Sequence, residues 1–443
     1  MPPRTPSRRT GARSPRAARP TGAAASADAP SSATTPDSTP DSTPAVDAPP
    51  APEAATLTLA QQEARTSEIT FADLGLSPAM LASLEAAGYT RPTPIQAQAV
   101  PLALKGRDLM GLAQTGTGKT AAFTIPIIER LMGGATRTRA LILTPTRELC
   151  QQVEESIRKY SGGTGLDVIS VYGGVGYEAQ TTALKNGVDI IVATPGRLID
   201  HLEKQHVVFD DLEVLVLDEA DRMLDMGFAP QINRIVAQIH PYRQTLLFSA
   251  TMPPEVEALA RKYLRKPQVV QVGRRSQAAA TVRHCVYPVP KHKKMDLLVH
   301  LLREAGADDS VLVFTRTKHG ADRVVRHLGD AGYAADALHA DKTQAQREQA
   351  LARFKAGETK LLVATDIAQR GLDISGITHV INFDVPQQAE DYVHRIGRTG
   401  RAAKEGDAFT FMCADEIGMV RTIERVIGQE IARISVPGFD FGT

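Results

Sequence analysis

The stretch Ala113-Gln-Thr-Gly-Thr-Gly-Lys-Thr120 decides the fold, because it joins a short apolar run to a helical pattern. Its two inner glycines let the backbone curl so that N–H groups converge on phosphate oxygens, and the helix N-terminus adds partial positive charge. We expect Lys119 to hold the β- and γ-phosphates of a nucleotide and the Thr120 hydroxyl to help coordinate magnesium. The alternative is a glycine-rich turn without a ligand, since Ala113 stands where the general phosphate-loop pattern has glycine.

An acidic box follows a second apolar run. Val214-Leu-Val-Leu217 leads directly into Asp218-Glu-Ala-Asp221, which places carboxylates at the C-terminal end of a buried strand, where open α/β sheets bind ligands. We assign Asp218 to the metal ion and Glu219 to the attacking water of phosphoryl transfer. Read alone, these acids could equally be ordinary residues of a helix start.

Short apolar runs alternate with helical patterns along two successive series. Runs that are apolar on both faces favour parallel sheets covered by helices on each side, so the chain is predicted to hold two α/β domains. Helices are expected between the strands of the second series, for example over 320–329. The predicted strands are Leu109–Ala113, Ala140–Thr144, Val168–Tyr172, Ile190–Ala193, Val214–Leu217 and Thr245–Phe248 in the first series, and Val311–Phe314, Ala335–Leu338, Lys360–Ala364, His379–Asn382 and Gly406–Met412 in the second.

Three arginines gather in the second series, in His394-Arg-Ile-Gly-Arg-Thr-Gly-Arg401. Arginine forks bind phosphates bidentately, and an arginine that neutralises transition-state charge raises the rate by roughly 10³ to 10⁵. Arg398 and Arg401 are the candidates. Their place on a second domain would make hydrolysis depend on domain closure, although a basic loop that only binds anions is the alternative.

Composition bounds the remaining possibilities. The 443 residues exceed the usual size of one hydrophobic core, and 51 basic against 50 acidic residues give no overall charge signal for nucleic acid. Three widely spaced cysteines form no disulfide framework, and no run approaches the roughly 20 apolar residues of a membrane span, which favours the cytoplasm.

The N-terminal segment consists mainly of Pro, Ala, Ser and Thr and is expected to be disordered. Its first twenty residues carry six arginines and no acid, so this end could touch RNA or be a solvated tail. A transit peptide is a third interpretation, but the prolines of this segment argue against an amphipathic targeting helix. The predicted organisation is a tail over 1–66, a first domain over 67–272, a linker over 273–283, a second domain over 284–435 and a short tail over 436–443.

Together these motifs resemble the DEAD-box RNA helicase family over about residues 71 to 438. The resemblance implies two tandem RecA-like domains and RNA-stimulated ATP hydrolysis with magnesium. The opening turns and the Val436-Pro-Gly-Phe439 ending look most similar to the bacterial RhlE-like branch. Besides the motifs above, the resemblance to the DEAD-box family rests on Gly88-Tyr-Thr-Arg-Pro-Thr-Pro-Ile-Gln96, Pro145-Thr-Arg-Glu-Leu149, Gly173-Gly174, Thr194-Pro-Gly-Arg197, Ser249-Ala-Thr251, Val313-Phe-Thr-Arg-Thr317, Gln344 with Arg347, and Thr365-Asp-Ile-Ala-Gln-Arg-Gly-Leu-Asp373.

The resemblance also implies residue roles. Gln96 would read the adenine edge, since an amide offers a donor and an acceptor together; Phe71 would pack on the base and Asp373 would contact the ribose. Ser249 and Thr251 would couple the acidic box to His394. The implied nucleotide site consists of Phe71, Arg91, Gln96, Ala113, Gln114, Thr115, Gly116, Thr117, Gly118, Lys119, Thr120 and Asp373.

The implied RNA track suits phosphate and sugar contacts, which position a strand without reading its sequence. Its residues are Thr146, Arg147, Gly174, Thr194 and Arg197 on the first domain, and Arg316, Thr317, Gln344, Arg347, Thr365 and Arg370 on the second.

The working hypothesis is an ATP-dependent RNA helicase that bends RNA and separates duplexes locally. It needs no second subunit, so we expect a monomer, and ribosome-assembly or RNA-decay proteins are compatible partners. Two rivals are an ATP-gated RNA clamp without productive turnover and a DNA-directed motor of the same superfamily.

Overall fold

The computed structural model describes residues 59–114, 116–133, 137–273, 282–304, 306, 309–366, 376–400, 406–436 and 438–440. Several sequence predictions fall outside these residues. They concern the tail up to residue 58, Thr115, residues 274–281 of the linker, Arg370, Asp373 and Arg401.

The first domain is built on a seven-stranded sheet with the order β3-β4-β2-β5-β6-β1-β7. All its strand pairs are parallel, so the carboxyl ends of the strands share one edge. At that edge Leu112 lies opposite Ser249, and Leu143 lies opposite Leu217. The strands are β1 (Leu109–Leu112), β2 (Ala140–Leu143), β3 (Val168–Val171), β4 (Ile190–Ala193), β5 (Val214–Leu217), β6 (Gln244–Ser249) and β7 (Gln268–Gln271).

Both faces of this sheet are covered. Val214 and Val216 of β5 belong to one buried cluster, whereas Leu215 and Leu217 belong to another, because successive side chains of a strand point to opposite faces. The helices are α1 (Leu59–Thr66), η1 (Phe71–Leu74), α2 (Pro78–Ala86), α3 (Pro94–Leu104), α4 (Lys119–Leu131), α5 (Arg147–Tyr160), α6 (Tyr177–Asn186), α7 (Pro195–Glu203), α8 (Ala220–Asp225), α9 (Ala229–Val236) and α10 (Pro254–Tyr263).

The second domain repeats the same plan. Its order β10-β11-β9-β12-β13-β8-β14 matches that of the first sheet strand for strand when each sheet is numbered from its first strand. All its pairs are parallel as well. Its strands are β8 (Val282–Pro288), β9 (Val311–Phe314), β10 (Ala335–Leu338), β11 (Leu361–Ala364), β12 (His379–Asn382), β13 (Gly406–Met412) and β14 (Ala432–Arg433).

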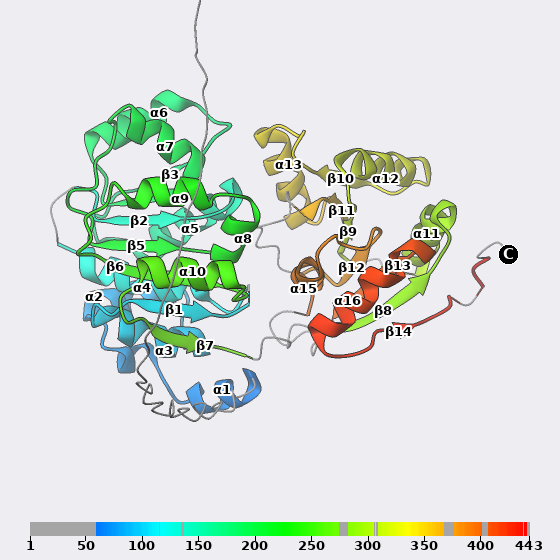
Figure 1. The fold of residues 1–443 in the computed structure, drawn as a ribbon, viewed down its shortest axis with the longest axis horizontal. Coiled ribbons are helices and arrows are strands. Elements are labelled where there is room, and N and C mark those ends of the chain that lie inside the picture. Colours follow the sequence, from blue (N-terminus) through cyan, green and yellow to red (C-terminus); the bar gives the residue numbers. More distant parts are fainter. Residues whose placement is uncertain are drawn as a thin grey trace, which may run out of the picture. The chain divides into compact units, whose positions relative to one another are not determined.

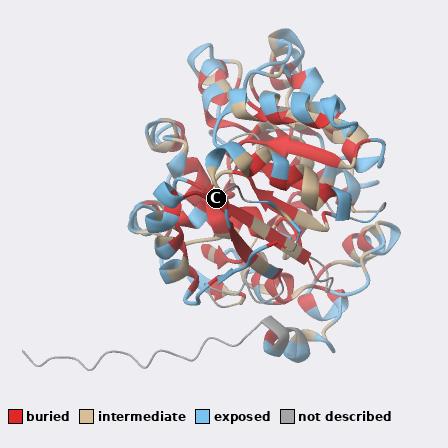
Figure 2. Cartoon of the chain, turned by 90° about the vertical axis from the view of Figure 1, so that its right-hand side faces the viewer, coloured by how far each residue is buried: buried red, intermediate tan, exposed pale blue. Residues whose placement is uncertain are grey.

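Helices cover this sheet on both faces too. Leu312 and Phe314 of β9 lie in one buried cluster, and Val311 and Val313 lie in the other. Figure 1 shows each sheet between helices, and Figure 2 shows buried strands with the exposed residues gathered on the helices. The helices are η3 (Lys291–Lys293), α11 (Lys294–Glu304), α12 (Lys318–Asp330), α13 (Gln344–Lys355), α15 (Ala389–Ile396), η4 (Ala414–Glu416) and α16 (Ile417–Ile427).

The predicted fold class is therefore confirmed, and every predicted strand is present to within one residue at its ends. Three strands were missed. β7 is an edge strand with polar ends and an exposed Val269, β8 carries Arg283 and His284 within its apolar run, and β14 has only two residues. Such runs lack the continuous apolar character of an interior parallel strand.

Some predicted boundaries also need correction. The prediction that 1–66 is entirely disordered is wrong for Leu59–Thr66, which forms α1. The side chain of Gln62 donates to the carbonyl of Gln271 at 2.9 Å and accepts from the N–H of Gly273 at 2.8 Å. Strand β8 begins inside the predicted linker, at Val282. Val436 of the predicted C-terminal tail is buried in the second domain.

The three cysteines are buried and free of disulfide bonds. Among the described helices, none has the length and apolar character that crossing a membrane requires.

Candidate nucleotide and nucleic-acid site

The phosphate-loop candidate begins where β1 ends. Gly118 has φ of 92°, in the left-handed region that favours glycine, and it caps α4. The Nζ of Lys119 donates to the carbonyl oxygen of Ala113 at 2.7 Å. Only 7% of Lys119 is exposed, so the ammonium is aligned within the loop by the loop's own backbone.

Gln96 joins this loop to the start of α3. Its Oε1 accepts from the N–H of Thr93 at 3.0 Å, and its Nε2 donates to the carbonyl of Gly118 at 3.1 Å. A Cβ on Gly118 would lie 2.4 Å from that Nε2, so a side chain at this position would force Gln96 to move. Phe71 is buried in the core of the first domain, and Arg91 is exposed.

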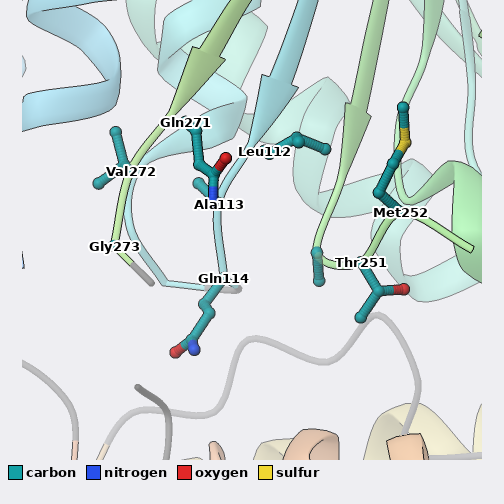
Figure 3. Close-up of a pocket in the computed structure, with 9 residues that line it drawn as sticks. Leu112, Ala113, Gln114, Thr251, Met252, Gln271, Val272 and Gly273 are labelled. Carbon is teal, nitrogen blue, oxygen red and sulfur yellow. The ribbon is translucent and has the colours of Figure 1, made fainter. Parts of the chain in front are cut away.

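A pocket opens at the carboxyl ends of β1, β6 and β7 (Figure 3). Leu112, Ala113 and Gln114 contribute the start of the loop to its lining, and Ala250, Thr251 and Met252 line it from the end of β6. Gln271, Val272 and Gly273 complete the lining. Two predicted elements, the phosphate loop and the Ser-Ala-Thr segment, thus share one pocket.

The acidic box lies at the end of β5, directly beside β6. Asp218 is 2% exposed, and its Oδ1 accepts from the N–H of Glu219 at 3.0 Å. Burial raises the pKa of Asp218 to about 7, with Lys119 opposing and Glu219 adding to the rise. Glu219 has φ of 49°, which is unusual for a residue with a side chain, and its Oε2 lies 3.6 Å from Nε of Arg222.

Asp221 connects the box to the segment after β6. Its Oδ2 accepts from the N–H of Thr251 at 2.9 Å and from the Thr251 hydroxyl at 2.8 Å. Its own N–H donates to the Ser249 hydroxyl at 3.3 Å. Burial would raise the pKa of Asp221, but nearby cations and the Thr251 hydroxyl outweigh it, so this pKa lies below its usual value. The structure brings together the two hydroxyls and the acidic box.

The residues at this edge fit a magnesium ion bound together with a nucleotide. The part of the chain that the structure describes contains no group of three His, Cys, Asp or Glu side chains that could hold a metal ion alone. Mg²⁺ is commonly bound by one or two carboxylates plus substrate phosphates, and it keeps several waters. Asp218, a buried carboxylate with a raised pKa beside Glu219, is a suitable single ligand, since a cation would favour its ionised form.

Two arginines of the first domain gather over a glycine pair. A Cβ on Gly174, whose φ is 89°, would lie 2.2 Å from Nη1 of Arg147. A Cβ on Gly173 would lie 3.7 Å from Nη2 of Arg147 and 3.8 Å from Nη2 of Arg197. Thr146 caps α5 by accepting from the N–H of Leu149 at 3.3 Å. Glycine at position 174 leaves room for the Arg147 guanidinium, and the Arg197 guanidinium lies near the same pair.

Three of the described RNA candidates of the second domain lie just after the carboxyl ends of parallel strands. Arg316 and Thr317 follow β9, and the Thr317 hydroxyl caps α12 by accepting from the N–H of Gly320 at 3.0 Å. Thr365 follows β11 directly. Gln344 and Arg347 lie in the first turn of α13, a few residues after the end of β10.

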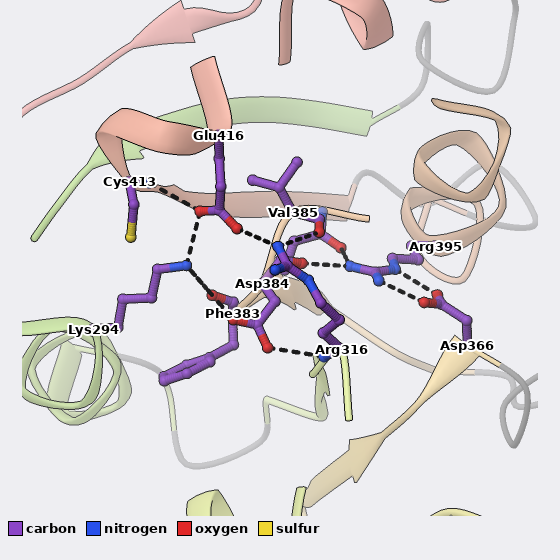
Figure 4. Close-up of polar contacts among 10 residues, drawn as sticks. Lys294, Arg316, Asp366, Phe383, Asp384, Val385, Arg395, Cys413 and Glu416 are labelled. Atoms are coloured by element: carbon purple, nitrogen blue, oxygen red, sulfur yellow. Dashed lines mark hydrogen bonds and ion pairs between the residues drawn. The ribbon is translucent and has the colours of Figure 1, made fainter. Parts of the chain in front are cut away.

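The arginine segment that begins at His394 contains a residue whose role the sequence interpretation missed. Arg395 is fully buried and pairs with Asp366 through Nε at 2.6 Å and Nη2 at 2.7 Å. Its Nη1 donates to the carbonyl of Asp384 at 2.7 Å (Figure 4) and to Asn382 Oδ1 at 3.1 Å. Arg395 therefore anchors α15 to the sheet, which supports the segment that carries His394 and Arg398. The sequence offered one signal for this ion pair, namely that the acidic residue Asp366 follows Thr365 directly.

The family models match both domains. Residues 93–259 match the DEAD/DEAH box helicase model, and residues 293–403 match the helicase conserved C-terminal domain. The DEAD-box ATP-dependent RNA helicase CshA of Geobacillus kaustophilus is 44% identical over 371 residues, which are 84% of this chain and 79% of the relative. The chain belongs to the DEAD-box RNA helicase family.

Further comparisons agree with this DEAD-box assignment. A CshA protein of Bacillus subtilis is 44% identical over 372 residues, covering 84% of this chain and 75% of the relative. The structure of S. cerevisiae Dbp5 bound to RNA and ADP BeF3 aligns with a TM-score of 0.76 at 28% identity, over 83% of this chain and 95% of that one. The two seven-stranded sheets are accordingly the two RecA-like domains of a DEAD-box protein.

Proposed function

We propose that this DEAD-box chain is an RNA-dependent ATPase that uses ATP hydrolysis to bend RNA and separate short duplexes. One observation carries the proposal. The Lys119 loop, the Asp218 box and the Arg147 and Arg197 pair all lie at the carboxyl edge of one parallel sheet. Nucleotide and phosphate backbone would then bind to neighbouring parts of the same edge, where open α/β sheets bind ligands.

The first domain would bind ATP. Lys119 holds the β- and γ-phosphates, and Glu219 orients the attacking water. Gln96 contacts the adenine edge, for which its two existing hydrogen bonds to Thr93 and Gly118 provide a fixed orientation. Asp218 and Thr120 would hold magnesium, which supplies neutralisation of phosphate charge.

The second domain would complete the site when RNA and ATP close the two domains. Arg398 and Arg401 neutralise the charge of the transferred phosphoryl group. Asp373 contacts the ribose, and Ser249 and Thr251 transmit closure from the acidic box to His394. Making the arginines part of a second domain prevents hydrolysis while the domains are apart.

The RNA partner would be a single strand or short duplex held largely without regard to sequence, since the candidate contacts suit phosphates and sugars. The S. cerevisiae Dbp5 structure described above is bound to RNA and ADP BeF3, which supports this pairing of ligands. We further propose a cytoplasmic monomer. Within the family, the C-terminal Val436 to Phe439 sequence supports an RhlE-like affiliation, whereas the two bacterial relatives described above are named CshA.

The test is ATP hydrolysis by the purified protein with single-stranded RNA, with DNA of the same length, and with neither. Strong stimulation by RNA alone is expected. Tight RNA binding without stimulation would replace the helicase proposal with an RNA clamp, and unwinding of DNA duplexes as well as RNA would favour a DNA-directed motor.

A further inference from the structure

Arg316, an RNA-track candidate, is held by two carboxylates of its own domain (Figure 4). Its Nη2 donates to Oε1 of Glu416 at 2.7 Å, and its backbone N–H donates to Oδ2 of Asp384 at 2.8 Å. The Arg316 side chain is 42% exposed, whereas that of Glu416 is 9% exposed. The Nη2 edge of the guanidinium is therefore held by Glu416, with the carbonyl oxygen of Val385 3.5 Å away, while the side chain still reaches solvent.

Both oxygens of Glu416 are occupied. While Oε1 accepts from Arg316, Oε2 accepts from Nζ of Lys294 at 3.1 Å and from the N–H of Cys413 at 3.0 Å. Glu416 ends η4 and immediately precedes α16, so its backbone is held by two helical segments. The carboxylate cannot swing away from Arg316 without giving up the Lys294 contact.

Lys294 makes this arrangement rigid. Its side chain is 3% exposed, and its Nζ also donates to the carbonyl of Phe383 at 2.9 Å and lies 3.7 Å from Oδ1 of Asp384. A buried ammonium keeps its acceptors, because losing one would leave its charge less fully compensated. Two cations and two carboxylates thus form one neutral cluster of Lys294, Arg316, Asp384 and Glu416.

We infer that Glu416 is a positioning residue for RNA binding, which orients the Arg316 guanidinium toward the phosphate backbone. The inference rests on the proposed function of Arg316 as an RNA contact. Preorganisation lowers the entropy lost when a long side chain binds a phosphate. The alternative is that Glu416 competes with RNA for Arg316. The Glu416 carboxylate is buried whereas the Arg316 side chain is exposed, and this arrangement favours positioning over competition.

Glu416→Gln tests the inference. An amide has one acceptor oxygen, and the buried Lys294 requires it, so the amide nitrogen would face Arg316 and release it. We expect the Kd for a single-stranded RNA oligonucleotide, measured with a non-hydrolysable ATP analogue, to rise about fivefold. The salt slope of log K should become shallower by up to roughly 0.7, the value of one single-strand phosphate contact.

A double-mutant cycle separates positioning from general stability. In an Arg316→Ala background, Glu416→Gln should leave the RNA Kd unchanged. Glu424→Gln is the matched control, because Glu424 on α16 binds Arg433 at 2.6 Å and does not contact the cluster. Thermal unfolding of each variant reports the stability loss, and only the Glu416 variant should combine it with weaker RNA binding.

Each alternative outcome has a distinct meaning. Tighter RNA binding with a steeper salt slope would show that Glu416 masks Arg316, and equal losses with and without Arg316 would show a purely structural role; either overturns the inference. If Arg316→Ala does not weaken RNA binding, the inference also fails. Failure of the wild-type protein to bind RNA would instead overturn the proposed function.

Discussion

The side-chain amide of Gln96 donates to the carbonyl of Gly118 at 3.1 Å, which ties the start of α3 to the phosphate loop. The two residues are 22 positions apart, and a side chain at position 118 would disturb the contact, because a Cβ there would lie 2.4 Å from the amide nitrogen. The adenine-contact candidate and the phosphate loop therefore form one unit.

Gly118→Ala should disrupt that unit. Its new methyl group would displace Gln96, and we expect the Kd for ATP to rise at least about tenfold, which is about 1.4 kcal/mol. Gly75→Ala is the control, because Gly75 has a similar φ of 82° but no atom within 4 Å of an added Cβ. Both variants should lose roughly 1–2 kcal/mol of stability from backbone strain. Equal ATP affinity in the two would contradict the role of the Gln96 contact.

Glu219→Gln should abolish turnover while preserving ATP-dependent RNA binding. The amide keeps the size of the side chain but cannot accept a proton from water, so we expect kcat to fall about 10² to 10⁴-fold. Single-turnover hydrolysis and RNA affinity measured with ATP would check this. Glu203→Gln, which removes an exposed partner of Arg234, should leave both unchanged. Normal turnover in the Glu219 variant would exclude its proposed role.

Asp218 should make stability depend on pH in the absence of nucleotide. Its pKa is raised by burial from 3.8 to about 7, so the folded protein binds a proton at pH values where the unfolded chain is ionised. Stability contributed at this site therefore falls as pH rises from about 4 to about 7 and stays low above. Asp218→Asn lacks this loss, so its Tm advantage over the wild type should grow across that range. A Tm difference between Asp218→Asn and the wild type that does not change with pH would refute the raised pKa of Asp218.

Asp366→Asn should destabilise the second domain. Arg395 is buried, and loss of its bidentate carboxylate leaves a charge that the remaining partners compensate only in part, which costs about 3 kcal/mol. Asp211→Asn is the matched control, since the Arg137–Asp211 pair at 3.0 Å is about half exposed. Its loss should cost below about 1 kcal/mol. Chemical denaturation of the two variants would test the contrast, and equal losses would contradict it.

Interior strands and the nucleotide motifs could be predicted from sequence because their signals are local. A parallel strand buried on both faces must be apolar throughout, as in Val214–Leu217 and Val311–Phe314. A phosphate loop likewise needs glycines and a lysine at fixed spacing beside a helix start, as Gly118 and Lys119 show. Such requirements act over a few residues, so the amino-acid order alone determined two α/β domains and an ATP-binding edge.

Tertiary structure decided the features that depend on distant partners. The edge strand β7, the helix α1 and the buried pair of Arg395 with Asp366 acquire their roles only through neighbours elsewhere in the fold. Glu416 meets Arg316 across 100 positions, a separation that no spacing pattern encodes. Sheet topology brings these side chains together. Burial of Arg395 and Glu416 then makes their pairing energetically necessary, since an uncompensated charge away from water is strongly unfavourable.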